Sequence, residues 1–284
     1  MRRIQFVIAI FIVLAQMGCT KNRNYKILNE NYFLHYIESF NQKDNELYIQ
    51  HISNDSAFTF LSENIPLIEV PDKDIEETYY FRWWTFRKHL KKTNDGFVIT
   101  EFLPDVPWAK KHNTINCPAG HQIYEGRWLR NPKYVQAYID FWLNKSGDGI
   151  RQYGFWVADA SLAFHKVHKN DFILSEQRPL LVNNYEEWER IRRDSTSILF
   201  WQEDGKEGME VSVSGRILNN GIPIGGMPAI RPTMNSYMYG DAKAISTIGE
   251  LANHPSVAME YKEKARLIKR EVQNRLWNEE LGFF

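Results

Sequence analysis

The chain has 284 residues, and its 35 lysines and arginines are balanced by 35 aspartates and glutamates. Proteins that bind nucleic acid concentrate positive charge, so this balance argues against that class. Hydrophobic residues make up 43% of the sequence, as in a globular protein, and aromatic residues make up 14%. Tryptophan and tyrosine fill cores, but they also stack on the apolar faces of sugar rings, so the composition leaves both uses open.

The N-terminus has the pattern of a targeting segment. Arg2 and Arg3 are followed by the apolar run Ile4–Ala15, which only Gln5 interrupts. This run is shorter than the roughly 20 residues that a membrane-spanning helix requires. A short apolar run behind a basic start is typical of a signal peptide, so we expect the protein to leave the cytoplasm.

The end of this segment resembles a bacterial lipoprotein cleavage site, because Gly18 precedes Cys19. We therefore expect a lipoprotein signal peptide over residues 1–19, with a lipid on Cys19 that anchors the chain in the periplasm or cell envelope. An ordinary secretory signal is the alternative. Residues 20–30 are mostly polar and are predicted to form a tether to one domain over residues 31–284.

A second cysteine, Cys117, has no partner for an internal disulfide once Cys19 is assigned to the lipid. His112, Cys117 and His121 lie within ten residues of one another. Their spacing fits no established zinc pattern, and a fourth ligand is not evident. We expect a buried thiol in a loop, and the sequence implies neither a metal nor an organic cofactor.

From Tyr32 onward, hydrophobic residues recur at spacings of three and four, which predicts helices. Asp55 and Asp72 are placed to cap two of them, and Pro179 is placed as the first residue of another. Val98, Thr100 and Phe102 indicate one brief extended segment. The predicted helices cover Tyr32–Phe40, Asp55–Leu61, Ile75–Leu90, Tyr124–Leu143 with an interruption near Pro132, Tyr153–His168, a helix from Pro179, Ala244–Ala252 and Val257–Leu276.

The predicted fold is therefore all-α. Acidic residues, arginines and tryptophans gather near helix starts and in loops, which suggests a helical toroid whose loops build a site at one mouth of a central funnel. A plain helical repeat or bundle is the alternative, and periodicity alone does not separate the two.

The stretch DGKEGMEVSVSG, residues 204–215, places Glu207 and Glu210 in a glycine-rich loop. Hydrolysis of a glycosidic bond requires two carboxyl groups, of which the acid must keep its proton near neutral pH. Glycine lets the backbone bring such a group close to a substrate. Many loops carry the same composition only for solubility, so composition alone favours neither a catalytic nor a solubilising role for these glutamates.

The order of residues adds to this reading. GMEVSVSG (208–215), followed by RPTMNSYMYGDAKAISTIGELA (231–252) and LWN (276–278), resembles inverting glycoside hydrolases built on an (α/α)₆ toroid. These are trehalases, α-glucosidases of glycoside hydrolase family 63 and mannosylglycerate hydrolase-like enzymes. The resemblance covers roughly residues 76–284 and is most specific in the first two stretches.

In that group a Gly-x-Asp-x-Ser loop supplies the general acid, and an Asn-Ser-Tyr helix start follows it. The resemblance places Glu210 at the acid position, with Ser212 behind it and Asn235 and Tyr237 at the helix entrance. The departure is Glu210 itself, because the family has Asp there. One extra methylene moves the carboxyl group by roughly an ångström, and a misplacement of that size can cost about a hundredfold in rate.

Segments before the loop resemble the sugar-pocket segments of these enzymes with less specificity. For each of their residues the alternative is a core aromatic or a buried ion pair. The implied substrate-binding residues are Tyr124, Glu125, Arg127 and Trp128 in GHQIYEGRWLR, Arg82 and Trp83 in YYFRWWTFR, and Trp156 and Asp159 in FWVADA.

A complete toroid of this kind has twelve helices, and about seven are predicted after Ile75. The family's catalytic base lies well beyond the acid, and no residue here fills that role. We therefore expect a partial, C-terminally truncated exported glycoside hydrolase that cleaves an α-linked glucoside or mannoside with inversion and has negligible turnover alone. The alternative is a non-catalytic carbohydrate-binding lipoprotein or a decayed fragment of such an enzyme.

Overall fold

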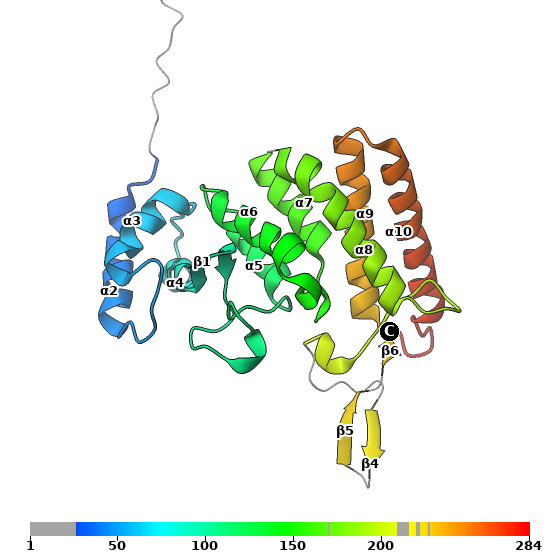
Figure 1. Ribbon diagram of the computed structural model, residues 1–284. Helices are drawn as coiled ribbons and strands as arrows, with labels where there is room; N and C mark the ends of the chain where they lie inside the picture. The colour runs from blue at the N-terminus through cyan, green and yellow to red at the C-terminus, as the bar shows by residue number, and fades with distance from the viewer. Residues whose placement is uncertain (1–26, 170, 209–215, 220–221, 227) are drawn as a thin grey trace, which may run out of the picture.

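The computed structural model describes residues 27–169, 171–208, 216–219, 222–226 and 228–284. Helices make up most of this part of the chain, which confirms the all-α prediction (Figure 1). The α-helices are α2 (Leu34–Lys43), α3 (Asn54–Asn64), α4 (Lys73–His89), α5 (Ala119–Gly126), α6 (Lys133–Asp140), α7 (Val157–His168), α8 (Arg178–Arg192), α9 (Pro232–Leu251) and α10 (Pro255–Arg275).

Strands occur only as three short antiparallel pairs in the described residues. One further isolated bridge joins Arg193 to Phe200, and another joins Asn278 to Phe283. The strands are β1 (Leu90–Thr93) with β2 (Gly96–Ile99), β3 (Trp201–Gln202) with β6 (Ala229–Ile230), and β4 (Arg216–Asn219) with β5 (Ile222–Gly226).

The two predicted aspartate caps have different outcomes. Asp72 is the N-cap of α4, and its side chain accepts hydrogen bonds from the backbone N–H groups of Asp74 and Ile75, so this prediction is confirmed. The prediction for Asp55 is wrong, because α3 begins one residue earlier, at Asn54, after the N-cap Ser53. Asp55 instead lies in the first turn of α3, where its charge favours the positive end of the helix.

Helix boundaries shift where turns intervene. The segment predicted over Tyr124–Leu143 is divided between α5 and α6, with the break before Pro132, as expected from that proline. The helix predicted through Leu90 ends at His89, because Leu90 starts the β1–β2 hairpin. Asn94 and Asp95 form the turn of this hairpin, and Gly96 follows with φ +105°, a backbone conformation that favours glycine.

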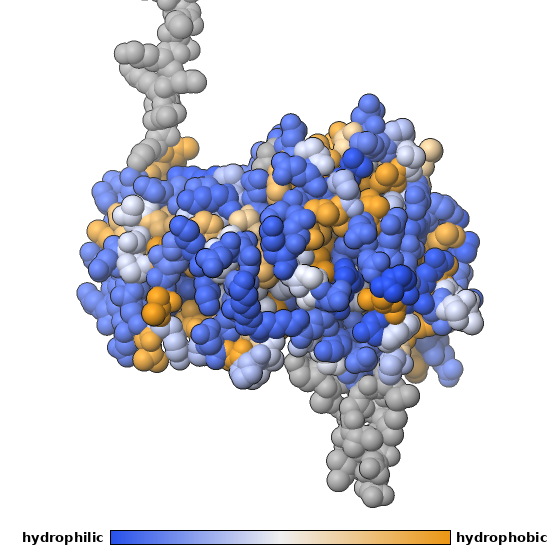
Figure 2. Space-filling view, viewed as in Figure 1, coloured by the Kyte–Doolittle hydropathy of each residue, from blue (hydrophilic) through white to orange (hydrophobic). Residues whose placement is uncertain are grey.

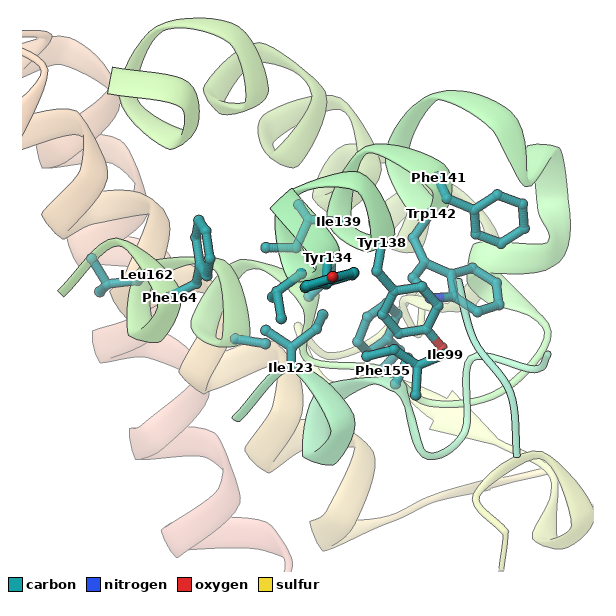
Figure 3. Packing of buried hydrophobic residues seen from close by; sticks show 14 of the residues in the cluster. Ile99, Ile123, Tyr134, Tyr138, Ile139, Phe141, Trp142, Phe155, Leu162 and Phe164 are labelled. Carbon is teal, nitrogen blue, oxygen red and sulfur yellow. The ribbon is translucent and has the colours of Figure 1, made fainter. Parts of the chain in front are cut away.

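The core behind the central helices is aromatic and aliphatic. Figure 3 shows residues of α5, α6 and α7 packed together, including Ile123, Tyr138 and Phe164, each fully buried. Tyr138 and Trp142 meet edge to face with ring centroids 5.8 Å apart. Most of the sequence's aromatic residues therefore serve packing, which was the plainer of the two readings of the composition.

Helices α5, α7 and α9 form a row, with α7 packed between the other two. Figure 1 shows α7, α8, α9 and α10 side by side at one end of the molecule, while α2, α3 and α4 lie at the other. Trp156, just before α7, contacts His121 of α5 and Tyr237 of α9. One turn later in each helix, Asp159 contacts Tyr124 and Asp241, so the three helices run in the same direction. Parallel inner helices joined through returning helices are the arrangement of an α-helical toroid.

Within the described residues, no helix combines the length and hydrophobicity needed to cross a bilayer.

Candidate functional site

The starts of the three parallel helices bring aromatic side chains together. Trp156, just before α7, lies 4.6 Å from Tyr237 of α9 and 4.7 Å from His121 of α5, measured between ring centroids. Gly120 is required for this contact, because a Cβ there would collide with the Trp156 indole. Trp156 and Tyr237 are both only partly buried, so the pair forms an aromatic surface at the mouth of the helix row.

One turn further along, Tyr124 of α5 donates a short hydrogen bond to the Oδ2 atom of Asp159 in α7. Burial raises the pKa of Tyr124 to about 12, and the hydrogen bond to Asp159 acts in the same direction. The phenol therefore keeps its proton and fixes the Asp159 carboxylate. Two predicted substrate-binding residues thus lie together beside the aromatic pair.

Four more of the predicted substrate-binding residues lie near Tyr124. Arg82 of α4 forms an ion pair with Glu125, with Nη2 and Oε2 2.6 Å apart. The guanidinium of Arg127 lies 4.5 Å from the ring centroid of Tyr124 and 5.0 Å from that of Trp128. Arg127 forms no ion pair with any described residue, and its buried Nε–H has no acceptor among them. Trp128 is 49% exposed and can contact a ligand.

Two predicted substrate-binding residues have structural positions instead. Trp83 is only 5% exposed and packs edge to face against Tyr79 and Phe86, so it belongs to the core. Asn235 is fully buried, and its side-chain amide bonds the backbone N–H and C=O of Phe200. It ties the first turn of α9 to the segment before β3. We therefore leave both residues out of the candidate site.

The segment that leads into the glycine-rich loop is fixed beside this site. Arg231, at the start of α9, forms a close ion pair with Asp204, and its Nε lies 3.6 Å from Glu207 Oε2. Glu207 Oε1 accepts a hydrogen bond of 3.2 Å from the backbone N–H of Met234. All three charged side chains are at most 5% exposed. Two carboxyl groups and the guanidinium between them thus hold residues 204–208, the loop stem, on the N-terminus of α9.

Sequence reasoning missed this anchor. It gave Glu207 no role beyond its place in the loop, and it gave none to Asp204 or Arg231. The available signal was the spacing: Asp204 and Glu207 are three residues apart in a turn, and Arg231 precedes Pro232 at a helix start. The first backbone N–H groups of any helix have no acceptor within the helix, so the start of α9 needs acceptors from elsewhere. Glu207 supplies one of them, to Met234 N–H.

Burial raises the pKa of Glu207 to about 7, although the hydrogen bond from Met234 favours the ionised form. The neutral form is therefore the one favoured by folding, relative to an ordinary value of 4.5. The contribution of neutral Glu207 to stability is present below about pH 4.5 and is lost as the pH rises through about 7.

We expect the Tm of the native chain, relative to that of Glu207→Gln, to fall as the pH rises from about 4.5 to about 7. A difference that stays constant from pH 4.5 to pH 7.5 would contradict the assignment.

Gly208 continues the anchored stem past Glu207. Its φ is +73°, and a Cβ there would lie 2.7 Å from the Cys117 Sγ, so no other residue fits without a shift. Cys117 was predicted to be buried and is half-buried in the structure. The stem therefore lies between Cys117 and the start of α9.

His112 and His121, which flank Cys117 in the sequence, have separate environments. His112 is buried with its Nε2 2.6 Å from Asp95 Oδ2, whereas His121 packs against Trp156. In the part of the chain that the structure describes, no three His, Cys, Asp or Glu side chains are grouped as metal ligands would be.

Glu210, the predicted general acid, and Ser212 lie outside the described residues, as do Cys19 and the rest of the predicted signal peptide. Two cavities of about 600 Å³ each lie elsewhere, one beside the β1–β2 hairpin and one between α3 and α6. None of the predicted site residues within the described ranges lines either cavity. The candidate site is therefore defined by contacts between side chains at the helix starts.

Comparison with known families places most of the chain in one of them. Residues 111–284 match the model described as "Mannosylglycerate hydrolase MGH1-like glycoside hydrolase domain". This range contains α5 to α10 and every residue of the candidate site except Arg82. Comparison with curated protein sequences finds no match.

A solved structure described as "Sialidase" has a similar fold and sequence. The two chains are 42% identical, with a TM-score of 0.83 over 90% of this chain. The match covers 23% of that protein, so this chain spans less than a quarter of its length.

Proposed function

Since this chain belongs to the MGH1-like glycoside hydrolase family, we propose that it is an exported glycoside hydrolase domain that acts on an α-linked glucoside or mannoside with inversion. Glu210 is the general acid in this proposal, and no residue of this sequence is assigned as the base that inversion requires. The substrate lies on Trp156 and Tyr237, and no metal or organic cofactor takes part.

The observation that carries the proposal is the anchored stem beside the aromatic pair. Lys206 C=O accepts a hydrogen bond of 2.8 Å from Gly154 N–H, two residues before Trp156. A Cβ on Gly154 would lie 3.2 Å from the Tyr237 ring, so the stem, Trp156 and Tyr237 meet at one place. Glu210 follows Gly208 by two residues in the sequence. A general acid must lie close to the bound sugar, because proton transfer to the leaving oxygen requires hydrogen-bond distance, and the position of the described stem supports this assignment for Glu210.

The nearby described carboxyl groups fit other roles. Asp159 is held by Tyr124 and lies one helical turn after Trp156, so we assign it to the sugar hydroxyl groups. Glu125 is paired with Arg82, and burial raises its pKa while Arg82 opposes that shift. We therefore propose that Asp159 and Glu125 bind substrate and do not activate water.

Arg127 favours a substrate that carries a carboxylate. Its guanidinium is stacked on two aromatic rings and has no carboxylate partner among the described residues, although its Nε–H is buried. A guanidinium binds a carboxylate through two parallel hydrogen bonds and binds vicinal hydroxyl groups more weakly. The name of the matching family model includes mannosylglycerate, a mannoside of an organic acid. We propose that an α-mannoside with a carboxylate on its aglycone is the preferred substrate class.

The proposal predicts that Trp156→Ala lowers the affinity for such a mannoside at least roughly tenfold, because stacking on a large aromatic face is lost. Isothermal titration of the native chain and the variant measures this. Trp108→Ala is the matched control: Trp108 is 55% exposed and packs against Phe102, away from the site, so its loss should leave affinity unchanged. Equal affinities for all three proteins, or none for the native chain, would overturn the proposal.

We propose that residues 1–19 direct export and that Cys19 carries the lipid anchor. The support is the sequence alone: a basic start, a short apolar run and Gly18-Cys19. A metabolic label with a radioactive fatty acid tests it, with Cys19→Ala as the control. Equal labelling of the two proteins would contradict a lipid on Cys19.

A further inference from the structure

The first turn of α7 carries two residues of the candidate site but has no cap of its own. Trp156 is the N-cap residue and has no side-chain oxygen to offer. The first hydrogen bond within the helix runs from Ala160 N–H to Trp156 C=O. The N–H groups of the three residues before Ala160 therefore need acceptors from elsewhere, as at any helix start.

Asp241 of α9 supplies two of these acceptor contacts. Its Oδ1 lies 3.0 Å from the Ala158 N and 2.9 Å from the Asp159 N. The side chain is buried, at 2% exposure, and lies one helical turn after Tyr237. A Cβ on Gly240 would lie 4.0 Å from the Asp159 Cβ, an ordinary van der Waals contact, so α7 and α9 pack directly against each other here.

We propose that Asp241 is a positioning residue that caps α7 from α9 and so fixes Trp156 and Asp159 relative to Tyr237. The cap joins the two helices whose aromatic residues form the proposed sugar surface. Its effect on sugar binding rests on the proposed function, whereas its effect on the α7 backbone does not.

The chemical form of the group supports this role. Burial raises the pKa of Asp241 well above its usual range, and the nearby Asp159 carboxylate adds to that effect. A neutral carboxylic acid still accepts hydrogen bonds at Oδ1, so the cap does not require a charge. Asparagine has nearly the same shape and the same acceptor. It should therefore replace Asp241 here, which it would not do for an ionised base or ion-pair partner.

Backbone amide exchange of the 284-residue chain tests the proposal directly. In Asp241→Ala the amides of Ala158 and Asp159 should exchange roughly tenfold faster than in the native chain, because a lost N-cap frees the first turn. Asp241→Asn should keep native exchange at both amides. Lys243→Ala, an exposed change on the same helix, should also leave them unchanged.

Mannoside affinity measured on the same proteins gives the functional consequence. We expect a loss of about tenfold or more in Asp241→Ala and rescue in Asp241→Asn. Native-like exchange in Asp241→Ala, or fast exchange in Asp241→Asn, would overturn the positioning role. Failure of the native chain to bind would overturn the proposed function and leave the exchange result standing. If Asp241→Ala does not fold, Asp241→Ser, which keeps a shorter acceptor, should show an intermediate rate, and native protection there would count against the proposal.

Discussion

Glu210→Gln is expected to lower the rate of glycoside hydrolysis by about 10²–10⁴-fold, the usual contribution of a general acid. Glutamine has nearly the same shape as glutamate but has no acidic proton to give to the leaving oxygen. Affinity for the substrate should therefore stay close to that of the native protein. The measurement is kcat on an α-mannoside in a preparation with hydrolytic activity, together with the Kd of the same substrate by titration.

Glu207→Gln is the matched control, because it makes the same chemical change three residues earlier in the same loop. The Glu207 side chain is 2% exposed and accepts a hydrogen bond from Met234 N–H, so it is not accessible to a substrate. Glutamine keeps an acceptor for that hydrogen bond, and most of the activity should survive. Undiminished hydrolysis in Glu210→Gln would refute the assignment, and a larger loss in Glu207→Gln would transfer the acid role to Glu207.

Arg231→Met should destabilise the chain by about 3–5 kcal/mol, because it leaves the buried carboxyl groups of Asp204 and Glu207 without their guanidinium. It also removes the hydrogen bond from Arg231 Nε to Gln202 C=O, 3.1 Å long. For a chain of this size that loss corresponds to a fall in Tm of roughly 6–20 °C. Thermal unfolding followed by circular dichroism measures it.

Arg266→Met provides the comparison, because Arg266 forms an exposed ion pair with Glu263 in α10. Solvent screens such pairs, so this change should leave the Tm nearly unchanged. An Arg231→Met variant as stable as Arg266→Met would show that the loop stem is held by other contacts. The anchor would then no longer explain how residues 204–208 are placed beside Trp156.

Much of the fold could be predicted from the sequence, because buried apolar residues repeat at helical spacing. The face of Leu181, Tyr185 and Trp188 is an example: all three are buried in α8. The short strands β1 and β3 could not be predicted, since each pairs through its backbone and carries no alternating pattern of its own. The start of α3 was misplaced because Ser53 and Asp55 are both acceptable cap residues, and only the backbone path decides between them.

The candidate site was predicted in part. Tyr124, Asp159, Trp156 and Tyr237 lie together, whereas Trp83 and Asn235 are structural. Sequence alone cannot separate the site residues from the structural ones, because a tryptophan in a core and a tryptophan in a pocket can both stand among the same kinds of residue along the chain. Asp241 and Arg231 act between elements that are distant in the sequence, through contacts with residues 24 to 83 positions away. Such partners become visible only when the packing is known.

Figure 2 shows that the face viewed is largely hydrophilic, with hydrophobic side chains in small groups among polar ones. No broad apolar surface on this face indicates a ligand, so the side-chain contacts at the helix starts are the better guide to the binding position.

The most direct measurement is a crystal structure of the chain with a non-hydrolysable α-mannoside bound. We predict that a sugar ring will lie against Trp156 or Tyr237, with the Glu210 carboxyl group within about 2.6–3.2 Å of the glycosidic oxygen. A mannoside bound in one of the distant cavities, or a Glu210 side chain directed into solvent, would contradict the account.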